Sequence, residues 1–589
     1  MRYLGTHSYK NLNMSKRKRK DHPSIINRNE EIKEKKSTMK RKIAGVALII
    51  TGLIIIGFIG FFLMLKIFSA PRIANLLPLK DTIALVETDI SGINGQFDYL
   101  LRLTQDSPAY SKENFINHLY EKYEIDFYKE ISPWIGGRHG AALIKGGNEI
   151  NEVYFIESRD HDQTLEFLKK YQMTHPDDAI VASNYRGYDI YSYKMSNNLK
   201  FFFAKKYLII SNQKEPLQQI INVLTHESDS LDSSRDYRTI ITNTNRDHLA
   251  FAYLDVQNGL GYIVKNPKYA KMLGREISLY MPLLKIYKQL GVSISAEGNG
   301  IKVQTYTSVD KESLKDNIYF RYDSKYNGKL LSHLPENPLS VFGGHNLSSQ
   351  LQRFESLLGE TNSLANILYR GEINKFIKMY LGEGIDYEKD ILPIFANEYL
   401  YFLEGSFSSP DYALILEIND ETNLKKLLPK FEQAFIKIAA NRNPITKEIE
   451  LADGTKAEEI VVDFNDIKKE EMAAKNANII SFKTSGGKEL ISYAINDNKF
   501  IFTTKISTLN NILEKTSEPD QNSEIHQKID KNIISSADEI GYVDLESFWP
   551  SGKFLSPEFL EYLLPFKKVY FGQEIFDNGT VAEYYFEVK

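Results

Sequence analysis

The pattern of apolar and polar residues is dominated by one run, Ile43–Leu65, that contains no charged residue. Three basic residues, 40–42, precede the run and Lys66 follows it. At roughly 1.5 Å of rise per residue, a helix of this length crosses a hydrocarbon core about 30 Å thick. The run therefore predicts a single transmembrane helix embedded in the lipid bilayer.

The charges beside this helix predict its orientation. Residues 1–42 hold 14 Lys and Arg against 4 Asp and Glu and show no apolar periodicity. We expect them to form a disordered cytoplasmic tail near anionic lipid head groups, with the bulk of the chain periplasmic. Cleavage after Ala70 would put Phe68 where a signal peptide has a small residue, so we interpret the run as an uncleaved anchor in the cell inner membrane. Met14 is an alternative start.

Beyond the anchor, strand patterns alternate with helical ones. The sequence DTIALVETD at 81–89 predicts a buried strand, KFFFAKKYLIIS at 200–211 a hairpin, and EGNG at 297–300 a hairpin turn. Further strands are expected at 152–157 and 250–255, and helices at 95–103, 113–123, 161–171 and 215–224. Tight turns between strands, with helices between groups of strands, indicate an α+β fold in which helices cover one face of an antiparallel sheet.

The same elements recur in the same order farther along the chain. IDFYKEISPWI at 125–135 corresponds to IDYEKDILPIF at 385–395, an offset of 260. LIISNQKEPLQQII from Leu208 corresponds to FIFTTKISTLNNIL from Phe500, an offset of 292. Similarity over this length indicates duplication of a whole domain rather than a short repeat. The larger second offset predicts an insertion in the second copy.

We therefore expect two tandem extracytoplasmic domains after the anchor. The predicted segments are a basic tail (1–42), a transmembrane helix (43–65), a linker (66–75), copy 1 (76–310), a connector (311–329) and copy 2 (330–589), with the insertion at about 441–477.

Composition and charge exclude several classes of function. Cysteine is absent, which excludes disulfides, thiolate metal sites, a cysteine nucleophile and a lipid-modified cysteine. Residues 43–589 carry a net charge of −14, which disfavours nucleic-acid binding. With one long apolar run, the chain is not a multi-span transporter.

The repeated block holds one shared acid, Asp126 in the first copy and Asp386 in the second. An acid directly before a helical run accepts hydrogen bonds from unpaired backbone N–H groups, so we interpret both as helix caps. Pro133 and Pro393 should end these helices. We expect Trp134 to pack under the following turn rather than to face a ligand.

Two glycine clusters, GGRHG at 136–140 and SGGKE at 485–489, lack the spacing of a phosphate-binding loop, and we interpret both as turns. His226 lies in a polar loop with Glu227 and Asp229, where a solvated linker is the better interpretation than a metal site. Tyrosines such as Tyr253 fit half-buried strand positions. We assign no catalytic, cofactor-binding or metal-binding residue and expect no cofactor.

Several of these motifs together resemble one family. The start LLPLKDTIALVETD, the block D-x-x-x-x-I-x-P-W-I-G-G from Asp126, the AALI strand after it and a strand that ends in an acid before a helix are similar to the bacterial domain-of-unknown-function family 3352. The resemblance covers most of 76–310 and, more loosely, 330–589, where Ile394 stands in place of Trp134. It implies a membrane-anchored or exported bacterial protein and carries over no catalytic residue.

The resulting hypothesis is a single-pass, noncatalytic envelope protein whose tandem ectodomain binds a protein partner or an envelope polymer. Two alternatives stay open. One is an envelope hydrolase that uses carboxylates, whose partners could lie far apart in the sequence. The other is a structural spacer or assembly scaffold.

Overall fold

The computed structural model describes a large part of the chain after the predicted anchor. The described residues are 72–90, 95–103, 116–117, 120–121, 125–147, 149–173, 180–193, 199–245, 247–265, 286–309, 326–352, 355, 363–452, 454–474, 477–515, 527–529, 531, 536–549, 563–576 and 578–588. Within these ranges no helix is long and apolar enough to cross a membrane. The predicted basic tail, the predicted transmembrane helix and most of the predicted helix 113–123 lie outside them.

The first half of the fold comprises the described residues from 72 to 309. Its elements are η1 (Ile73–Asn75), β1 (Thr82–Asp89), α2 (Gln96–Leu103), η3 (Phe127–Ile131), β2 (Ile135–Gly146), β3 (Glu149–Ser158), α4 (His161–Met173), β4 (Ile180–Tyr185), β5 (Tyr188–Tyr193), β6 (Lys200–Ala204), β7 (Tyr207–Ser211), α5 (Lys214–Leu224), η4 (Leu231–Ser233), α6 (Arg235–Asn243), β8 (Ala250–Asp255), α7 (Val256–Lys265), β9 (Tyr287–Glu297) and β10 (Gly300–Val309). The predicted strand 81–89, helix 161–171, hairpin at 200–211 and hairpin turn at 297–300 are confirmed.

The second half comprises the described residues from 326 to 588. Its elements are η6 (Lys329–His333), β11 (Ser340–His345), α10 (Ser363–Tyr380), η7 (Tyr387–Ile391), η8 (Leu392–Phe395), β12 (Glu398–Ser406), β13 (Ser409–Glu417), α11 (Glu421–Arg442), β14 (Ile445–Glu450), β15 (Lys456–Val461), η9 (Phe464–Asp466), β16 (Ile467–Ala474), β17 (Ala477–Thr484), β18 (Glu489–Asn496), β19 (Lys499–Thr503), α12 (Ile506–Glu514), β20 (Glu539–Asp544), α14 (Leu545–Phe548), β21 (Phe566–Phe576) and β22 (Gly579–Val588).

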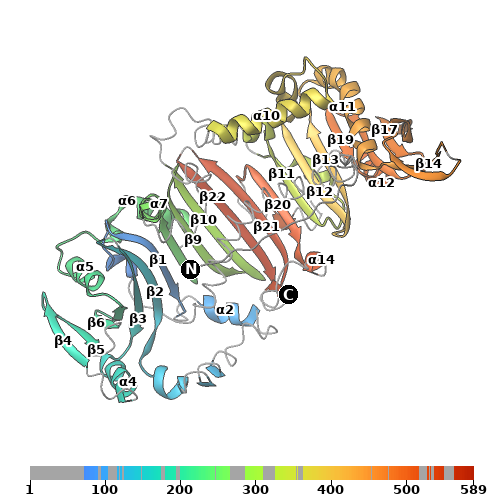
Figure 1. Cartoon of the computed structure of the whole chain (residues 1–589). Coiled ribbons are helices and arrows are strands. Elements are labelled where there is room, and N and C mark those ends of the chain that lie inside the picture. The colour runs from blue at the N-terminus through green and yellow to red at the C-terminus, as the bar shows by residue number, and fades with distance from the viewer. Residues whose placement is uncertain are drawn as a thin grey trace, which may run out of the picture. The chain divides into compact units, whose positions relative to one another are not determined.

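Both halves contribute to one antiparallel sheet of 20 strands (Figure 1). The pairings give the spatial order β4-β5-β6-β7-β3-β2-β1-β8-β9-β10-β22-β21-β20-β11-β12-β13-β19-β18-β17-β16. From the outer edge to the β10–β22 pair, the order β4-β5-β6-β7-β3-β2-β1-β8-β9-β10 of the first half matches the order β16-β17-β18-β19-β13-β12-β11-β20-β21-β22 of the second. The antiparallel α+β prediction is confirmed, and hydrogen bonds between β10 and β22 join the two predicted copies in one sheet.

Helices cover both faces of the outer parts of the sheet, not one face as the sequence predicted. Successive strand residues point to opposite faces. On β3, Phe155 packs in the core that holds α5 and α6, whereas Ile156 packs with residues of α4. On β13, Ile415 shares a core with α12, whereas Leu416 packs against α11. Because the strand residues that point to either face of the sheet are apolar, helices pack against both faces.

The fold begins earlier than the predicted linker allowed. Ile73 and Ala74, placed in the linker by the sequence, are core residues, and η1 packs close to η4. In the same way, Tyr326 in the predicted connector packs against the core of the second half. The N–H of Gly328 donates to the Glu398 carboxylate at 2.9 Å. Ile73, Ala74 and Tyr326 therefore belong to the folded halves.

The prediction of a turn at 136–140 is wrong, because these residues lie in β2. A Cβ on Gly136 would come within 2.2 Å of the Glu157 side chain, and one on Gly140 within 2.5 Å of the Val86 carbonyl oxygen. These two glycines therefore make room for neighbours in the sheet. The second cluster, 485–489, does form the turn between β17 and β18.

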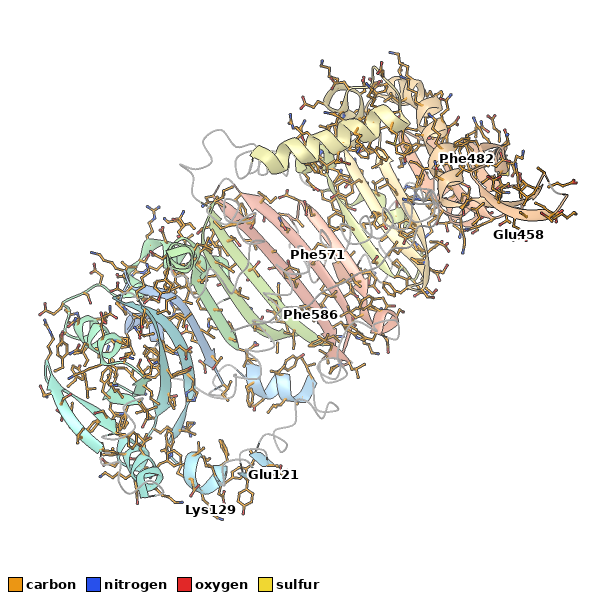
Figure 2. All side chains as sticks on the ribbon, in the orientation of Figure 1. Glu121, Lys129, Glu458, Phe482, Phe571 and Phe586 are labelled. Atoms are coloured by element: carbon orange, nitrogen blue, oxygen red, sulfur yellow. The ribbon has the colours of Figure 1, made fainter. Side chains whose placement is uncertain are left out.

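The predicted insertion at 441–477 contains a hairpin and a strand. The hairpin β14–β15 is a separate two-stranded sheet whose strands pair with each other. Figure 2 shows this hairpin, with Glu458 labelled on β15. The following segment, Ile467–Ala474, is β16, the last strand of the large sheet. Part of the predicted insertion is therefore a regular strand at the sheet edge.

Candidate functional site

The two capping aspartates are confirmed as structural residues. Each begins a short π-helical turn, η3 or η7. The Asp126 carboxylate accepts a hydrogen bond from the Lys129 N–H at 3.2 Å. The Asp386 carboxylate accepts from the N–H groups of Glu388 and Lys389 at 2.9 and 3.0 Å. These bonds pair backbone donors that the helical turn leaves unpaired.

Trp134 is packed as the sequence predicted. Its side chain is 5% exposed and lies 5.5 Å from the Phe167 ring, centroid to centroid. Its indole N–H donates to the Glu130 carbonyl at 2.7 Å. The residue in its place in the second half, Ile394, is also buried. Both positions therefore serve packing beneath the turn.

His226 lies in a turn after α5. Its neighbour Glu227 forms an ion pair with Arg186 at 2.6 Å. Among the described residues, no group of three or more His, Asp or Glu side chains could hold a metal ion.

Buried acids in the first half bond to the protein itself. Arg138 donates to the Asp89 carboxylate through Nε at 2.8 Å and Nη2 at 2.5 Å. The Glu157 carboxylate accepts from the N–H groups of Gly137 and Arg138 at 2.5 and 2.9 Å. Glu87 accepts from the Ile73 N–H at 3.2 Å, which ties η1 to the sheet. These carboxylates fasten backbone segments around β2.

Glu398 has a comparable role in the second half. It is 1% exposed and accepts from the N–H groups of Asn327 and Gly328, both at 2.9 Å. Burial raises the pKa of Glu398, and the negative charge of Glu417 raises it further, whereas the two N–H donors oppose the shift. The carboxylate holds the start of the second half against β12.

The second half also contains a pocket of about 470 Å³ between η6, β12 and α12. Its floor is formed by His333, Phe402, Thr508 and Ile512, which are buried. Glu404, half-buried, forms part of the wall. The residues around the mouth are Pro335, Glu336, Asn337, Asn511, Glu514 and Lys515. The lining therefore combines an imidazole and apolar groups with acids.

His333 is the least satisfied polar group of this pocket. It is 5% exposed, and neither ring nitrogen has a hydrogen-bond partner. Burial, together with the positive charges of Lys499 and Lys515, lowers the pKa of His333 to about 4. The nearby Ile512 carbonyl opposes this shift without making a hydrogen bond of normal geometry. The imidazole is therefore neutral at pH 7, with one donor and one acceptor unused.

Two contacts within the lining fix the neighbouring polar groups. The Thr508 hydroxyl donates to Glu404 Oε1. The Lys515 ammonium donates to the Leu334 carbonyl oxygen. The first contact orients a carboxylate in the pocket wall. The second gives the lysine of the mouth a partner in the protein.

The pocket was not predicted from the sequence, although a comparison of the two halves contains a signal for it. The strand registers match Ile144 of β2, which faces Asn151, with Glu404 of β12, which faces Asp411. The 292 offset matches Pro216 with Thr508. Alignment of the Leu-Pro pairs at 77–78 and 334–335 places Leu76 opposite His333. Three buried apolar positions of the first half thus carry polar residues in the second.

Fold and site together define an α+β protein built on one long antiparallel sheet, with a polar pocket in its second half. A family model described as "Protein of unknown function (DUF3352)" matches residues 104–571. The chain therefore belongs to this family. The match runs across both halves, from before η3 of the first half into β21 of the second, and ends before β22. No curated protein matches the chain.

Solved structures give a distant likeness only. The solved structure described as "Structure of crystal form I of TP0453" is 11% identical; the match covers 45% of this chain and 83% of that chain, with a TM-score of 0.23. The one described as "Structure of crystal form III of TP0453" is 11% identical; the match covers 44% of this chain and 83% of that chain, with a TM-score of 0.24. At such TM-scores the likeness carries no conclusion about this chain.

Proposed function

We propose that this protein is a noncatalytic binding module of the bacterial cell envelope and that the pocket of its second half receives the ligand. The observation that carries this proposal is the buried, unpaired His333 imidazole on the floor of a pocket of about 470 Å³. An unpaired polar group in a closed core costs about 1–3 kcal/mol. A ligand that bonds to the imidazole would recover this cost.

The proposal extends to the origin of the fold by duplication. Leu85 of β1 faces Ala142, as Val341 of β11 faces Phe402. Ala142 and Phe402 are 260 residues apart, which is the offset of the repeated block in the sequence. The turn glycines Gly300 and Gly579 match at an offset of 279, which makes Glu583 of β22 the counterpart of Gln304 of β10. These two residues face each other at the junction, and Gln304 donates to Glu583 at 2.8 Å. Such self-complementary pairing is the pattern of a two-fold symmetric dimer interface. It supports an ancestral pair of identical chains that became fused.

We also propose that Ile43–Leu65 anchors the protein in the inner membrane with the bulk of the chain periplasmic. Protease added to cells with a permeabilised outer layer should remove the residues beyond the anchor and spare the tail. Antibodies against tags at the two termini would follow each end. Protection of the C-terminal tag would contradict this orientation.

The binding proposal is tested on protein purified in detergent from its native membranes. Solvent extraction and mass spectrometry should find a small molecule that accompanies the wild-type chain and is absent from the His333→Leu variant. The Glu372→Gln variant, altered on the exposed surface of α10, is the control and should keep the molecule. An identical extract from all three proteins would contradict ligand binding in the pocket.

A further inference from the structure

We propose that the pocket between η6, β12 and α12 binds a small organic ammonium compound with an apolar body. This inference rests on the proposed binding function and adds the chemical class of the ligand. It is carried by the contrast between the two halves, by the unpaired imidazole on the floor and by the charge of the lining.

The first half acts as an internal comparison. Leu76 and Ile144, which correspond to His333 and Glu404, are 1% and 0% exposed and belong to the apolar core. A polar group placed in such a core without a partner destabilises the fold. The second half carries polar groups at these positions and has a cavity there. The polar lining therefore suits a ligand that forms hydrogen bonds.

The floor offers both kinds of hydrogen bond and an apolar surface. The neutral His333 ring presents one N–H donor and one nitrogen acceptor, and neither is used within the protein. Phe402 and Ile512 are buried beside it and supply apolar contact. A ligand with an N–H group and a hydrocarbon portion satisfies these groups together.

The charge of the lining selects the sign of the ligand. The lining holds three carboxylates, Glu336 and Glu514 at the exposed mouth and the half-buried Glu404 in the wall, against one lysine, Lys515, whose ammonium donates to the Leu334 carbonyl. Lys499 also acts on His333 but does not line the pocket. The net negative lining attracts a cation, and the half-buried Glu404 acts more strongly than a carboxylate on an open surface. Glu404 is already oriented by Thr508 and can accept a charge-assisted hydrogen bond from an ammonium group.

The test titrates the purified full chain in detergent with phenethylamine by calorimetry. A neutral analogue, 2-phenylethanol, and an anionic one, 3-phenylpropionate, serve as matched probes. We expect phenethylamine to bind at least about tenfold more tightly than either analogue, since its charge-assisted hydrogen bond to Glu404 is stronger than a bond from a neutral group. Glu404→Gln, which keeps the acceptor for Thr508, should weaken phenethylamine binding by about tenfold or more.

The controls separate the ligand class from the binding function. Glu372→Gln removes the same charge on α10 and should leave the affinity unchanged, and thermal melting checks that each variant is folded. Equal binding of all three probes, no binding of phenethylamine, or an unchanged affinity in Glu404→Gln would overturn the ammonium class. If a His333-dependent molecule nevertheless accompanies the purified protein, the binding module stands and only the class fails. If neither is found, both proposals fail.

Discussion

Single residues decide where the two halves of the sheet differ. Leu76, the residue after η1, corresponds to His333, the last residue of η6, and both are buried. The leucine completes an apolar core, whereas the imidazole loses its water contacts and gains no partner in the protein. The unpaired His333 imidazole therefore lowers the stability of the fold, and substitution of this residue measures by how much.

Stability should depend on pH through His333. Its pKa is about 4 in the folded chain and 6.5 in its ordinary state. As the pH falls from 6.5 to 4, the unfolded chain takes up a proton that the folded chain does not, so the free energy of unfolding decreases by roughly 3 kcal/mol. His333→Leu should lack this loss and should be more stable than the wild type, with a difference that grows as the pH falls.

Urea unfolding of both proteins at pH 7.5, 5.5 and 4.5, followed by tryptophan fluorescence, measures the difference. Both proteins retain Glu336, Glu404, Glu514, Lys499 and Lys515, so the titration of these neighbours cancels to first order in the comparison. An equal pH dependence in the two proteins would contradict the low pKa of His333.

Elements differ in how much the rest of the fold depends on them. The hairpin β14–β15 pairs only with itself among the described strands, and its side chains are exposed or half-buried. Ile445 and Val461 face each other at its base, so the chain enters and leaves the hairpin at neighbouring points. In contrast, β16 directly after it continues the large sheet.

Replacement of residues 445–461 by a short Gly-Ser turn should therefore leave the fold intact. We expect the thermal midpoint to change by no more than about 2–4 °C, the shift that about 1 kcal/mol produces in a domain of 150–250 residues. A matched deletion of β16, Ile467–Ala474, should lower the midpoint clearly, because it removes a paired strand of the sheet. A large loss on removal of the hairpin alone would show that its surface supports the fold.

At the scale of the whole molecule, the β10–β22 pair joins the two halves. Lys302 of β10 forms an ion pair with Glu583 of β22 at 3.1 Å, and Gln304 donates to the same carboxylate. These contacts link residues almost half the chain apart. Such long-range pairing forms late and at a high entropic cost, so its register is a strict test of the fold.

The absence of cysteine makes this register directly testable. Gln304→Cys combined with Glu583→Cys places two thiols on facing positions of one sheet face, where mild oxidation should join them. The bridge closes a loop of 279 residues and should speed migration on a non-reducing gel. Gln304→Cys with Ala582→Cys, which lies on the opposite face, is the control. Absence of a bridge in the first pair would contradict the junction.

Local signals in the sequence predicted the elements and their caps. Asp126 and Asp386 precede helical turns and cap them, and the hairpin turn at 297–300 follows from its glycines. The glycines at 136–140 misled the prediction, because their role is to admit Glu157 and other neighbours across the sheet. The residues around a glycine in the sequence do not indicate which distant side chain will pack against it in the fold.

By itself, the sequence predicted elements such as the strand at 81–89, the helix at 161–171 and the two aspartate caps, since each depends on residues near one another in the chain. Only the tertiary structure decided how the two halves meet at Gln304 and Glu583, and that Glu404, Thr508 and His333 line one pocket. These groups come from three separate elements. Their meeting depends on strand pairing and packing across more than a hundred residues, which no local pattern specifies.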